Sequence, residues 1–423
     1  MNNIPGATGS LIKRKYFYII LPTFIGSVIA YLDRVNIAYA ALTMNEDLGF
    51  SAQIFGMGAG IFFFGYVLFE VPGALIAERW SPRIWIARIM ITWGIISFWM
   101  AFIQNAWQFY LVRFLLGAAE ASFYPVVYAS IIPRWFTPEE RPRAIALMLA
   151  SLQISAIIGS PLAGWLLGVH WFVFKGWQIL FMMEAIPAIM FGILVLFWLS
   201  DWPVEVNWLS EEEKQYLMMQ YEQERAVKEA VRQYTVWQAL CDWEVLKLCL
   251  IYFLWITGYW GFNYWMPTVV KEVSGWSNLA IGWLIVIPML LSLIAMLYTG
   301  SSSSKTGEKR WHGALPMFIG AAGMGIGTFI SNPSVNFIFV IITAIGVYSA
   351  FGVWWSYPTT FLSGMAAAGA VGLINSFGNV GGYVGPYLTG FIKGMTGSFH
   401  WAYIYLACSL TAAGVLMLTL KRR

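Results

Sequence analysis

Apolar stretches long enough to cross a membrane recur twelve times along this chain. A helix needs about 20 apolar residues to span the hydrocarbon core, and backbone polar groups in lipid must be paired within the helix. The pattern predicts an all-α membrane protein with twelve transmembrane helices in two six-helix halves. We place the spans at residues 16–41, 52–77, 84–103, 107–132, 144–168, 177–200, 246–268, 279–300, 313–331, 335–356, 366–392 and 399–420.

The composition excludes an ordinary soluble globule. Of the 423 residues, 59% are hydrophobic and 11% charged, whereas soluble domains average about 25% charged residues. Cys241, Cys249 and Cys408 lie in or beside apolar segments without metal-ligand spacing, so we expect packing roles rather than a disulfide or zinc site. The first apolar run is too long for a cleavable signal peptide and is read as the first span.

Lysine and arginine are concentrated in alternate loops and at both ends of the chain. The basic positions are Lys13, Arg14, Lys15, Arg79, Arg83, Arg134, Arg141, Arg143, Lys305, Lys309, Arg310, Lys421, Arg422 and Arg423. The opposite loops carry mainly Lys175, Lys271 and Lys393. Because basic loops stay on the cytoplasmic side, we predict that both termini are cytoplasmic.

One long polar segment, 201–244, divides the spans six plus six. Its Ser210 followed by Glu211, Glu212 and Glu213 resembles a helix N-terminus. We therefore expect an N-terminal half at 1–200, a solvated cytoplasmic linker at 201–245 and a C-terminal half at 246–423.

The two halves also look related when one is shifted onto the other by 225 positions. The coincidences are Pro133 with Pro358, Phe136 with Phe361, Pro161 with Pro386, and Ser160 with Gly385. Parallel repeats with a substrate site between them at mid-depth are a known plan of transporters. The shift therefore favours a central cavity between the halves.

Four ionisable residues lie deep in predicted spans of the first half. Asp33 and Arg34 are adjacent in the first span, and Arg113 and Glu120 are seven apart in the fourth, on one helical face about 10 Å apart along the axis. Such residues usually face a partner or a water-filled cavity. An organic anion would be attracted to an arginine if a carboxylate took up a proton. The alternative is a set of static ion pairs that fix helix packing.

The repeat places no charge at the matching positions of the second half, which are Gly258, Tyr259, Ile338 and Ile345. That half offers amides, hydroxyls and aromatic rings instead: Asn263, Tyr264, Trp354, Trp355, Ser356, Asn375 and Asn379. A cavity between the halves would have one charged wall and one of amides and rings. Glu70 and Glu184 are weaker candidates, because either could be hydrated near an interface, and a structural role is favoured.

Other polar residues in spans are candidates for the cavity. Asn375 and Asn379 lie four apart on a glycine-lined helix with overlapping GxxxG pairs, a pattern that by itself means close packing. Gln153 and Tyr66 are similar candidates. The chain has no Walker phosphate loop and no HExxH pair, so we expect no direct drive by ATP, no enzyme, no metal and no cofactor.

Five motifs resemble the anion:cation symporter family of the major facilitator superfamily over nearly the whole chain. They are Leu32-Asp33-Arg34-x-Asn36-Ile37, Gly65-Tyr66-x-x-x-Glu70-x-Pro72, Arg113-x-x-x-Gly117-x-x-Glu120-Ala121, Trp135-Phe136 with Arg143-Ala144, and Asn375-x-x-Gly378-Asn379-x-Gly381-Gly382. The resemblance implies the major facilitator fold and uptake of an organic carboxylate with protons. Relatives carry sugar acids such as galactonate and glucarate, tartrate, phthalate or hydroxyphenylacetate.

The resemblance also assigns roles to residues at matching positions. It implies that Asp33 and Glu120 bind the proton, that Arg34 and Arg113 govern anion binding and gating, and that further residues line the substrate site: Tyr66, Gln153, Trp354, Asn375 and Asn379. A gating loop is present as Glu78, Arg79 and Arg83. In its second copy the usual acidic residue is Ser304, which puts the latch of the second half in question.

We therefore expect a proton symporter for a sugar acid, hydroxy-dicarboxylate or aromatic acid in a bacterial inner membrane. Its partners would be the small organic anion, protons and the lipid bilayer, without nucleic acid, and a monomer suffices for the mechanism. Exchange of one organic anion for another is the alternative within this class. A sensor that binds without transport, and a membrane enzyme using Asp33 and Glu120 as acid and base, are the alternatives outside it.

Overall fold

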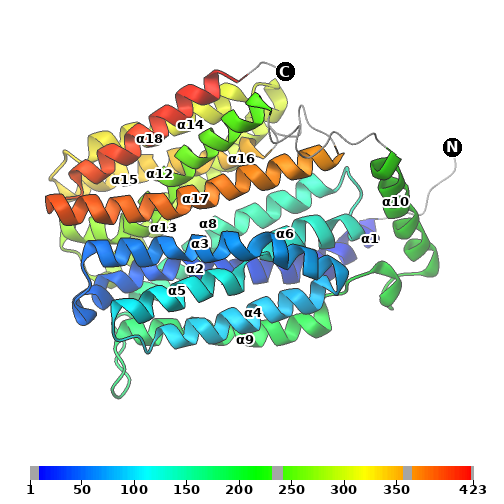
Figure 1. Ribbon diagram of the computed structural model, residues 1–423, viewed down its shortest axis with the longest axis horizontal. Coiled ribbons are helices and arrows are strands. Elements are labelled where there is room, and N and C mark those ends of the chain that lie inside the picture. The colour runs from blue at the N-terminus through cyan, green and yellow to red at the C-terminus, as the bar shows by residue number, and fades with distance from the viewer. Residues whose placement is uncertain (1–8, 231–241, 356–363, 421–423) are drawn as a thin grey trace.

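The computed structural model describes residues 9–230, 242–355 and 364–420. In these ranges the chain forms a bundle of helices that run roughly along its long axis (Figure 1). Helix α10 (Glu211–Ala230) and the start of α1 (Gly9–Lys15) lie at one end of the bundle, here called the terminal end, and the opposite end is called the distal end. Several predicted features lie outside the described residues, namely Cys241, Ser356, Pro358, Phe361 and the basic residues 421–423.

The first half of the chain forms the lower part of the bundle in Figure 1. Two of its transmembrane helices are irregular, since π-helical turns interrupt the first and the fourth, and the fourth also breaks after Glu120. The elements are α1 (Gly9–Lys15), η2 (Tyr16–Ile20), α2 (Leu21–Leu48), α3 (Ala52–Arg79), α4 (Pro82–Met100), α5 (Ala106–Glu120), α6 (Phe123–Val126), η3 (Val127–Ile131), α7 (Ile132–Trp135), α8 (Arg141–Leu166) and α9 (Gly176–Trp198).

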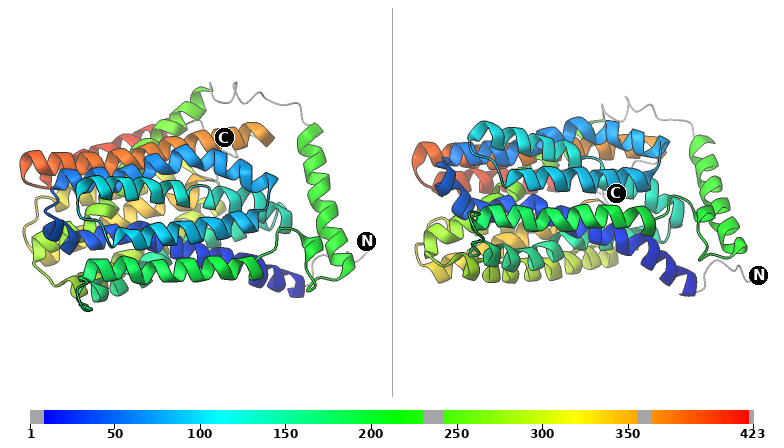
Figure 2. Two further views of the ribbon diagram at one scale, coloured as in Figure 1. Left: turned by 60° about the horizontal axis from the view of Figure 1, so that its bottom comes forward. Right: turned by 90° about the horizontal axis from the view of Figure 1, so that it is seen from below.

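The linker crosses the terminal end as a short 3-10 turn, η4 (Pro203–Glu205), and helix α10 (Glu211–Ala230) (Figure 2). Ser210 and Glu213 form a reciprocal capping box, in which each side chain accepts a hydrogen bond from the other's backbone N–H. Arg141 of α8 donates to both carboxylate oxygens of Glu224, at 2.7 and 2.5 Å. The linker helix is therefore fastened to the first half.

The second half forms the upper part of the bundle in Figure 1. Its elements are α12 (Trp243–Ser274), α13 (Asn278–Thr306), α14 (Arg310–Gly327), α15 (Pro333–Ser349), α16 (Phe351–Trp354), α17 (Gly364–Thr396) and α18 (His400–Leu418). Helices α12 and α17 are the longest of these and pack against one another.

Ten helices of the described chain are long and apolar enough to cross a membrane. The two further predicted spans, 313–331 and 366–392, correspond to α14 and α17, which lie in the bundle beside the others (Figure 1). Both helices are less apolar than the other ten. Arg310 and His312 lie at the start of α14, and α17 contains several glycines together with Asn375 and Asn379. Helix α17 packs between α3 and α12, so less of its surface has to be apolar enough for lipid.

The two halves meet along three helix pairs, α3 with α17, α8 with α13, and α2 with α12. The backbones come closest toward the distal end. A Cβ atom added to Gly56 of α3 would lie 2.6 Å from the carbonyl oxygen of Pro386, and one added to Gly282 of α13 would lie 2.4 Å from that of Ser160. Glycine at these positions lets the halves touch where any side chain would separate them.

Candidate functional site

Arg34 and Glu120 form a buried ion pair at the centre of the first half. Arg34 of α2 donates a hydrogen bond from Nη2 to Oε1 of Glu120, the last residue of α5. The two residues are 8% and 1% exposed. An isolated charge at this depth would be costly, so each group stabilises the other.

Aromatic rings from three other helices surround the Arg34 guanidinium. Its central carbon lies 5.1 Å from the ring centres of Phe62 and Tyr66, and 5.9 Å from those of Tyr124 and Trp260. Trp260 belongs to α12 of the second half. Ring faces attract cations without neutralising them, so the rings hold the guanidinium in place while it keeps its charge.

A break in the fourth transmembrane helix places Glu120 at a helix end. The backbone turns at Ala121, and Ser122 has a φ of 72°, a left-handed conformation that few non-glycine residues adopt. The Trp85 indole donates to the Ser122 hydroxyl at 3.0 Å. The partial negative charge at the C-terminus of α5 favours a cation there, which suits the guanidinium of Arg34. Interrupted helices are a common device at transporter binding sites.

Arg113 lies seven positions before Glu120 on α5 and is fully buried. It donates to the backbone carbonyls of Gly58 and Ala59 of α3 at 3.2 and 3.4 Å, and it approaches the Tyr264 hydroxyl of α12 at 3.5 Å. Its guanidinium carbon also lies 4.8 Å from the Phe62 ring centre. No ion pair joins Arg113 to a carboxylate in the described part of the chain. The two arginines and one carboxylate therefore carry a net positive charge.

Asp33 faces away from this group, although it precedes Arg34 in the sequence. Successive helical residues point about 100° apart, and the Oδ1 atom of Asp33 accepts a hydrogen bond from the Ser97 hydroxyl of α4, inside the first half. Its Oδ2 atom has no partner among the described residues. The four charged residues are thus divided into a central group of three and Asp33.

The second half contributes hydroxyls, amides and rings. The hydroxyl groups of Tyr31 on α2 and Tyr259 on α12 are hydrogen-bonded across the interface. Tyr348 donates to Oδ1 of Asn263 at 2.6 Å, and the Asn263 amide donates to the Tyr259 carbonyl at 2.7 Å. In the same half, Trp354 stacks on Tyr252 with ring centres 5.3 Å apart. This wall is polar but uncharged.

Glu70 and the asparagines of α17 bridge the halves toward the terminal end. The amide groups of Asn375 and Asn379 donate to the two carboxylate oxygens of Glu70 on α3, at 2.7 and 3.2 Å. Glu70 is 6% exposed. The helices α3 and α17 are therefore joined by polar contacts here and by close glycine packing toward the distal end.

The remaining predicted site residues lie around this centre. Tyr66 is buried against Arg34, and Gln153 of α8 contacts the sulfur of Met296 on α13 at 3.3 Å. At the terminal end, Glu78 pairs with Arg134 of α7 at 2.9 Å. Arg79 is exposed, and the backbone N–H of Arg83 donates to Asp201 at 2.7 Å.

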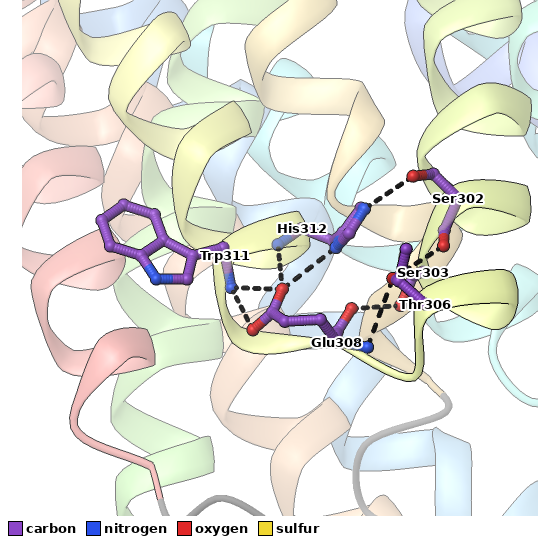
Figure 3. A network of polar contacts seen from close by, with 6 residues as sticks. All are labelled: Ser302, Ser303, Thr306, Glu308, Trp311 and His312. Carbon is purple, nitrogen blue, oxygen red and sulfur yellow. Dashed lines mark hydrogen bonds and ion pairs between the residues drawn. The ribbon is translucent and has the colours of Figure 1, made fainter.

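The second copy of the predicted gating loop lies between α13 and α14, and hydrogen bonds to Glu308 hold this loop together (Figure 3). The carboxylate of Glu308 accepts hydrogen bonds from the backbone N–H groups of Trp311, at 2.9 and 3.0 Å, and His312, at 3.2 Å. Its backbone carbonyl accepts from the Ser303 hydroxyl at 2.8 Å. Burial raises the pKa of Glu308, but the hydrogen bonds that its carboxylate accepts from Trp311 and His312 outweigh that effect and leave the pKa below its ordinary value. The local acid is therefore four residues beyond Ser304.

Sequence reasoning missed several residues of the centre. Tyr31 is one helical turn before Arg34, so its spacing could have identified it. Phe62, Tyr124 and Trp260 could not be told from ordinary packing residues, because their role comes from neighbours far away in the sequence.

Comparisons with known proteins agree with this architecture. Residues 23–370 match the family model of the Major Facilitator Superfamily. A relative from Agrobacterium vitis named "Putative tartrate transporter" is 43% identical over 397 residues, covering 93% of this chain and 90% of the relative. The "Quinolone resistance transporter" of Acinetobacter baumannii is 36% identical over 399 residues, covering 94% and 92%. These proteins are named for different substrates.

Solved structures share the fold at low sequence identity. A bacterial homologue of the human lysosomal transporter Spinster aligns with a TM-score of 0.76 at 16% identity, covering 97% of this chain and 96% of that one. A D-xylose–proton symporter aligns with a TM-score of 0.75 at 15% identity, covering 96% and 97%. The arrangement in two six-helix halves is therefore confirmed.

Proposed function

Since the chain belongs to the major facilitator superfamily, and is a multi-pass membrane transporter rather than an enzyme, we propose that it takes up a small organic carboxylate together with protons. The observation that carries this proposal is the central group of two arginines and one carboxylate, Arg34, Arg113 and Glu120, at the contact between the halves. Its net positive charge suits one carboxylate group of a substrate.

The surroundings of these arginines favour a substrate with hydroxyl groups. The hydroxyls of Tyr31, Tyr259 and Tyr264 and the amide of Asn263 lie on or near the same interface. They can donate to and accept from alcohol groups. A hydroxy-dicarboxylate or sugar acid fits this chemistry, and the name of the Agrobacterium vitis relative makes tartrate the first compound to test.

We assign proton coupling to Asp33 and Glu120. Protonation of Glu120 would neutralise its carboxylate and free Arg34 for the substrate, so that proton and anion favour one another's binding. Tyr66, Gln153 and Trp354 would shape the substrate site, and Asn375 and Asn379 would respond to its occupancy through Glu70.

Transport would proceed by rocking of the two halves about this centre. The contacts that must separate are glycine packing at the distal end and the Glu70 bridge toward the terminal end. Glu78, Arg79 and Arg83 would govern the terminal end of the first half. The basic loops support a cytoplasmic location for both termini in a bacterial inner membrane, and one chain contains both walls of the site.

The direct test is uptake by purified protein in liposomes. Radiolabelled tartrate should accumulate when the outside is made acidic, and an ionophore that dissipates the pH gradient should abolish accumulation. Glucarate, galactonate, phthalate and hydroxyphenylacetate serve as alternative substrates in the same assay. Accumulation that depends on a preloaded organic anion but not on pH would support exchange, and binding without counterflow would support a sensor; either result refutes proton symport.

A further inference from the structure

Glu184 is a buried carboxylate for which the transport cycle above has no use. It lies within α9 and is 6% exposed. Neither of its carboxylate oxygens has a hydrogen-bond partner in the described part of the chain. The charged group that acts on it there is Asp33. An acidic group in such surroundings is stable only when it is protonated or gains a partner.

Asp33 also has a buried carboxylate oxygen without a hydrogen-bond partner among the described residues. Ser97 satisfies its Oδ1 atom, while the buried Oδ2 atom has no hydrogen-bond donor among the described residues. Asp33 and Glu184 lie on α2 and α9, which pack against one another inside the first half. One carboxyl group that keeps its proton could therefore satisfy both residues by a single hydrogen bond.

Other polar atoms extend this environment along the same helices. Asn36, one turn beyond Asp33, and Trp93, one turn before Ser97, are fully buried, and their side-chain N and O atoms have no partners among the described residues. Residues three or four apart share a helical face. The contact of α2, α4 and α9 thus carries polar groups where pure packing would place apolar ones.

Few helices place charged residues near Asp33 and Glu184. Arg34, Arg113 and Glu120 act on Asp33 from α2 and α5. Helix α4 carries only Arg83 and Arg88, toward the terminal end, and the guanidinium of Arg88 lies over Trp85 at 3.9 Å.

The remaining charges near these helices lie at their ends. Helix α9 has no other ionisable group, and α8 brings Arg141 and Arg143 at the terminal end. At the distal end of α2, Glu46 and Asp47 are present, and Asp47 pairs with Lys175. None of these charges is among the groups that act on Glu184.

We propose that Glu184 keeps its proton and donates it in a hydrogen bond to Oδ2 of Asp33, which makes Asp33 a proton site set apart from the anion site. Asp33 then binds and releases one transported proton, in addition to the proton assigned to Glu120, while Glu184 positions Asp33 and stabilises its ionised form. This inference rests on the proposed function, since it assigns the proton of the symport to a place inside the first half.

The charges balance in both loading states. Without substrate, ionised Asp33 offsets the net positive charge of Arg34, Arg113 and Glu120. With substrate, Asp33 and Glu120 each hold a proton from water, and the two carboxylates of a dicarboxylate such as tartrate supply the negative charge instead. Proton and anion therefore bind together although they do not touch, and the coupling acts across one residue of α2.

Infrared difference spectroscopy of the full-length protein in lipid nanodiscs tests the protonation state without any substrate. Wild type should show a carboxylic acid C=O band at neutral pH that disappears in Glu184→Gln and persists in the matched surface control Glu205→Gln, since Glu205 is exposed. Absence of the band, or its persistence in Glu184→Gln, would overturn the proposal whether or not the protein transports tartrate.

The pH profile of tartrate binding tests the link to Asp33. Glu184→Gln keeps a hydrogen-bond donor, so its pH midpoint should stay within about half a unit of wild type. Glu184→Leu removes the donor and should raise the midpoint by about one unit, since ionised Asp33 loses its stabilising partner. Equal midpoints for all three proteins would refute the link. Failure of wild type to bind any tested carboxylate would instead refute the proposed function, with the infrared result still deciding the state of Glu184.

Discussion

The two halves of this transporter bury different kinds of polar side chain. The interior of the first half holds charged residues, including Asp33, Arg34, Glu70, Arg113 and Glu120. In the second half, the buried serine, threonine and asparagine residues of the described chain have no charged counterpart: Thr257, Asn263, Ser292, Ser303, Asn336, Thr343, Ser349, Thr389 and Ser409. Under the proposed function, the first half would bind the ions and the second half would contact the neutral parts of the substrate.

Among the variants considered, loss of the Arg34 side chain should have the largest effect on substrate binding. Arg34→Ala takes away the anion partner and leaves Glu120 buried without a counter-charge, which costs about 3–5 kcal/mol when one member of a buried pair is lost. We expect at least a 100-fold loss of tartrate affinity, measured by calorimetry on the purified protein. Lys13→Ala, which removes an exposed positive charge, is the control. Ordinary affinity in Arg34→Ala would reassign this arginine to packing.

Glu120→Gln should separate coupling from exchange. The amide cannot release a proton, so pH-driven accumulation should fall by at least tenfold, while tartrate counterflow in liposomes continues because exchange does not require deprotonation. The exposed Glu222→Gln provides the comparison. Unchanged accumulation in Glu120→Gln would refute the proposed role of Glu120 in proton coupling.

Glu70→Ala should weaken the bridge between the halves. Hydrogen bonds to a charged acceptor contribute about 1.5–3 kcal/mol each, and this variant removes those from Asn375 and Asn379. Amide hydrogen exchange in the adjoining part of α17 should rise about tenfold or more. Ser376→Ala alters a half-buried side chain of the same helix, whose hydroxyl donates to the Gly372 carbonyl within α17, and this variant should exchange like wild type. Unchanged exchange in Glu70→Ala would mean that glycine packing alone holds α17.

Trp354 tests the uncharged wall. Trp354→Phe keeps a ring against Tyr252 and should alter the ratio of tartrate to phthalate uptake by a few-fold, because the shape of the wall changes while its packing is retained. Trp354→Ala also opens a cavity and should cost about 3–5 kcal/mol of stability. A change in folded yield without any change in substrate preference would assign Trp354 to packing.

The smallest effect is expected at the loop of Glu308. Because the folded state lowers the pKa of this carboxyl group, its contribution to loop stability is complete above the unfolded value and is lost as the pH falls through the folded value. The protection factors of the amides at residues 307–312, which correct for the intrinsic pH dependence of exchange, should therefore fall below about pH 4.5 in wild type. In Glu308→Gln they should be lower at neutral pH and nearly independent of acid, and wild-type protection factors insensitive to acid would contradict this account.

Much of the candidate site could be expected from the sequence. Membrane-length apolar runs predicted the helices, and charges within them identified Arg34, Arg113 and Glu120, since a charged residue in lipid requires a reason. The sequence could not show that Asp33 faces Ser97 or that Glu70 faces α17, because helical periodicity fixes the angle between side chains but not which neighbour each one meets.

The sequence by itself thus determined the membrane fold, the six-plus-six division and the confinement of buried charge to the first half. These follow from local properties, namely the length and apolarity of each span and the cost of charge in hydrocarbon. Only the tertiary structure decided how the charges are divided, with Arg34 paired to Glu120 at a helix break and Asp33 bonded to Ser97 inside the first half. That choice depends on the packing of helices distant in sequence, where the rotation of each helix against its neighbours sets which polar groups can satisfy one another.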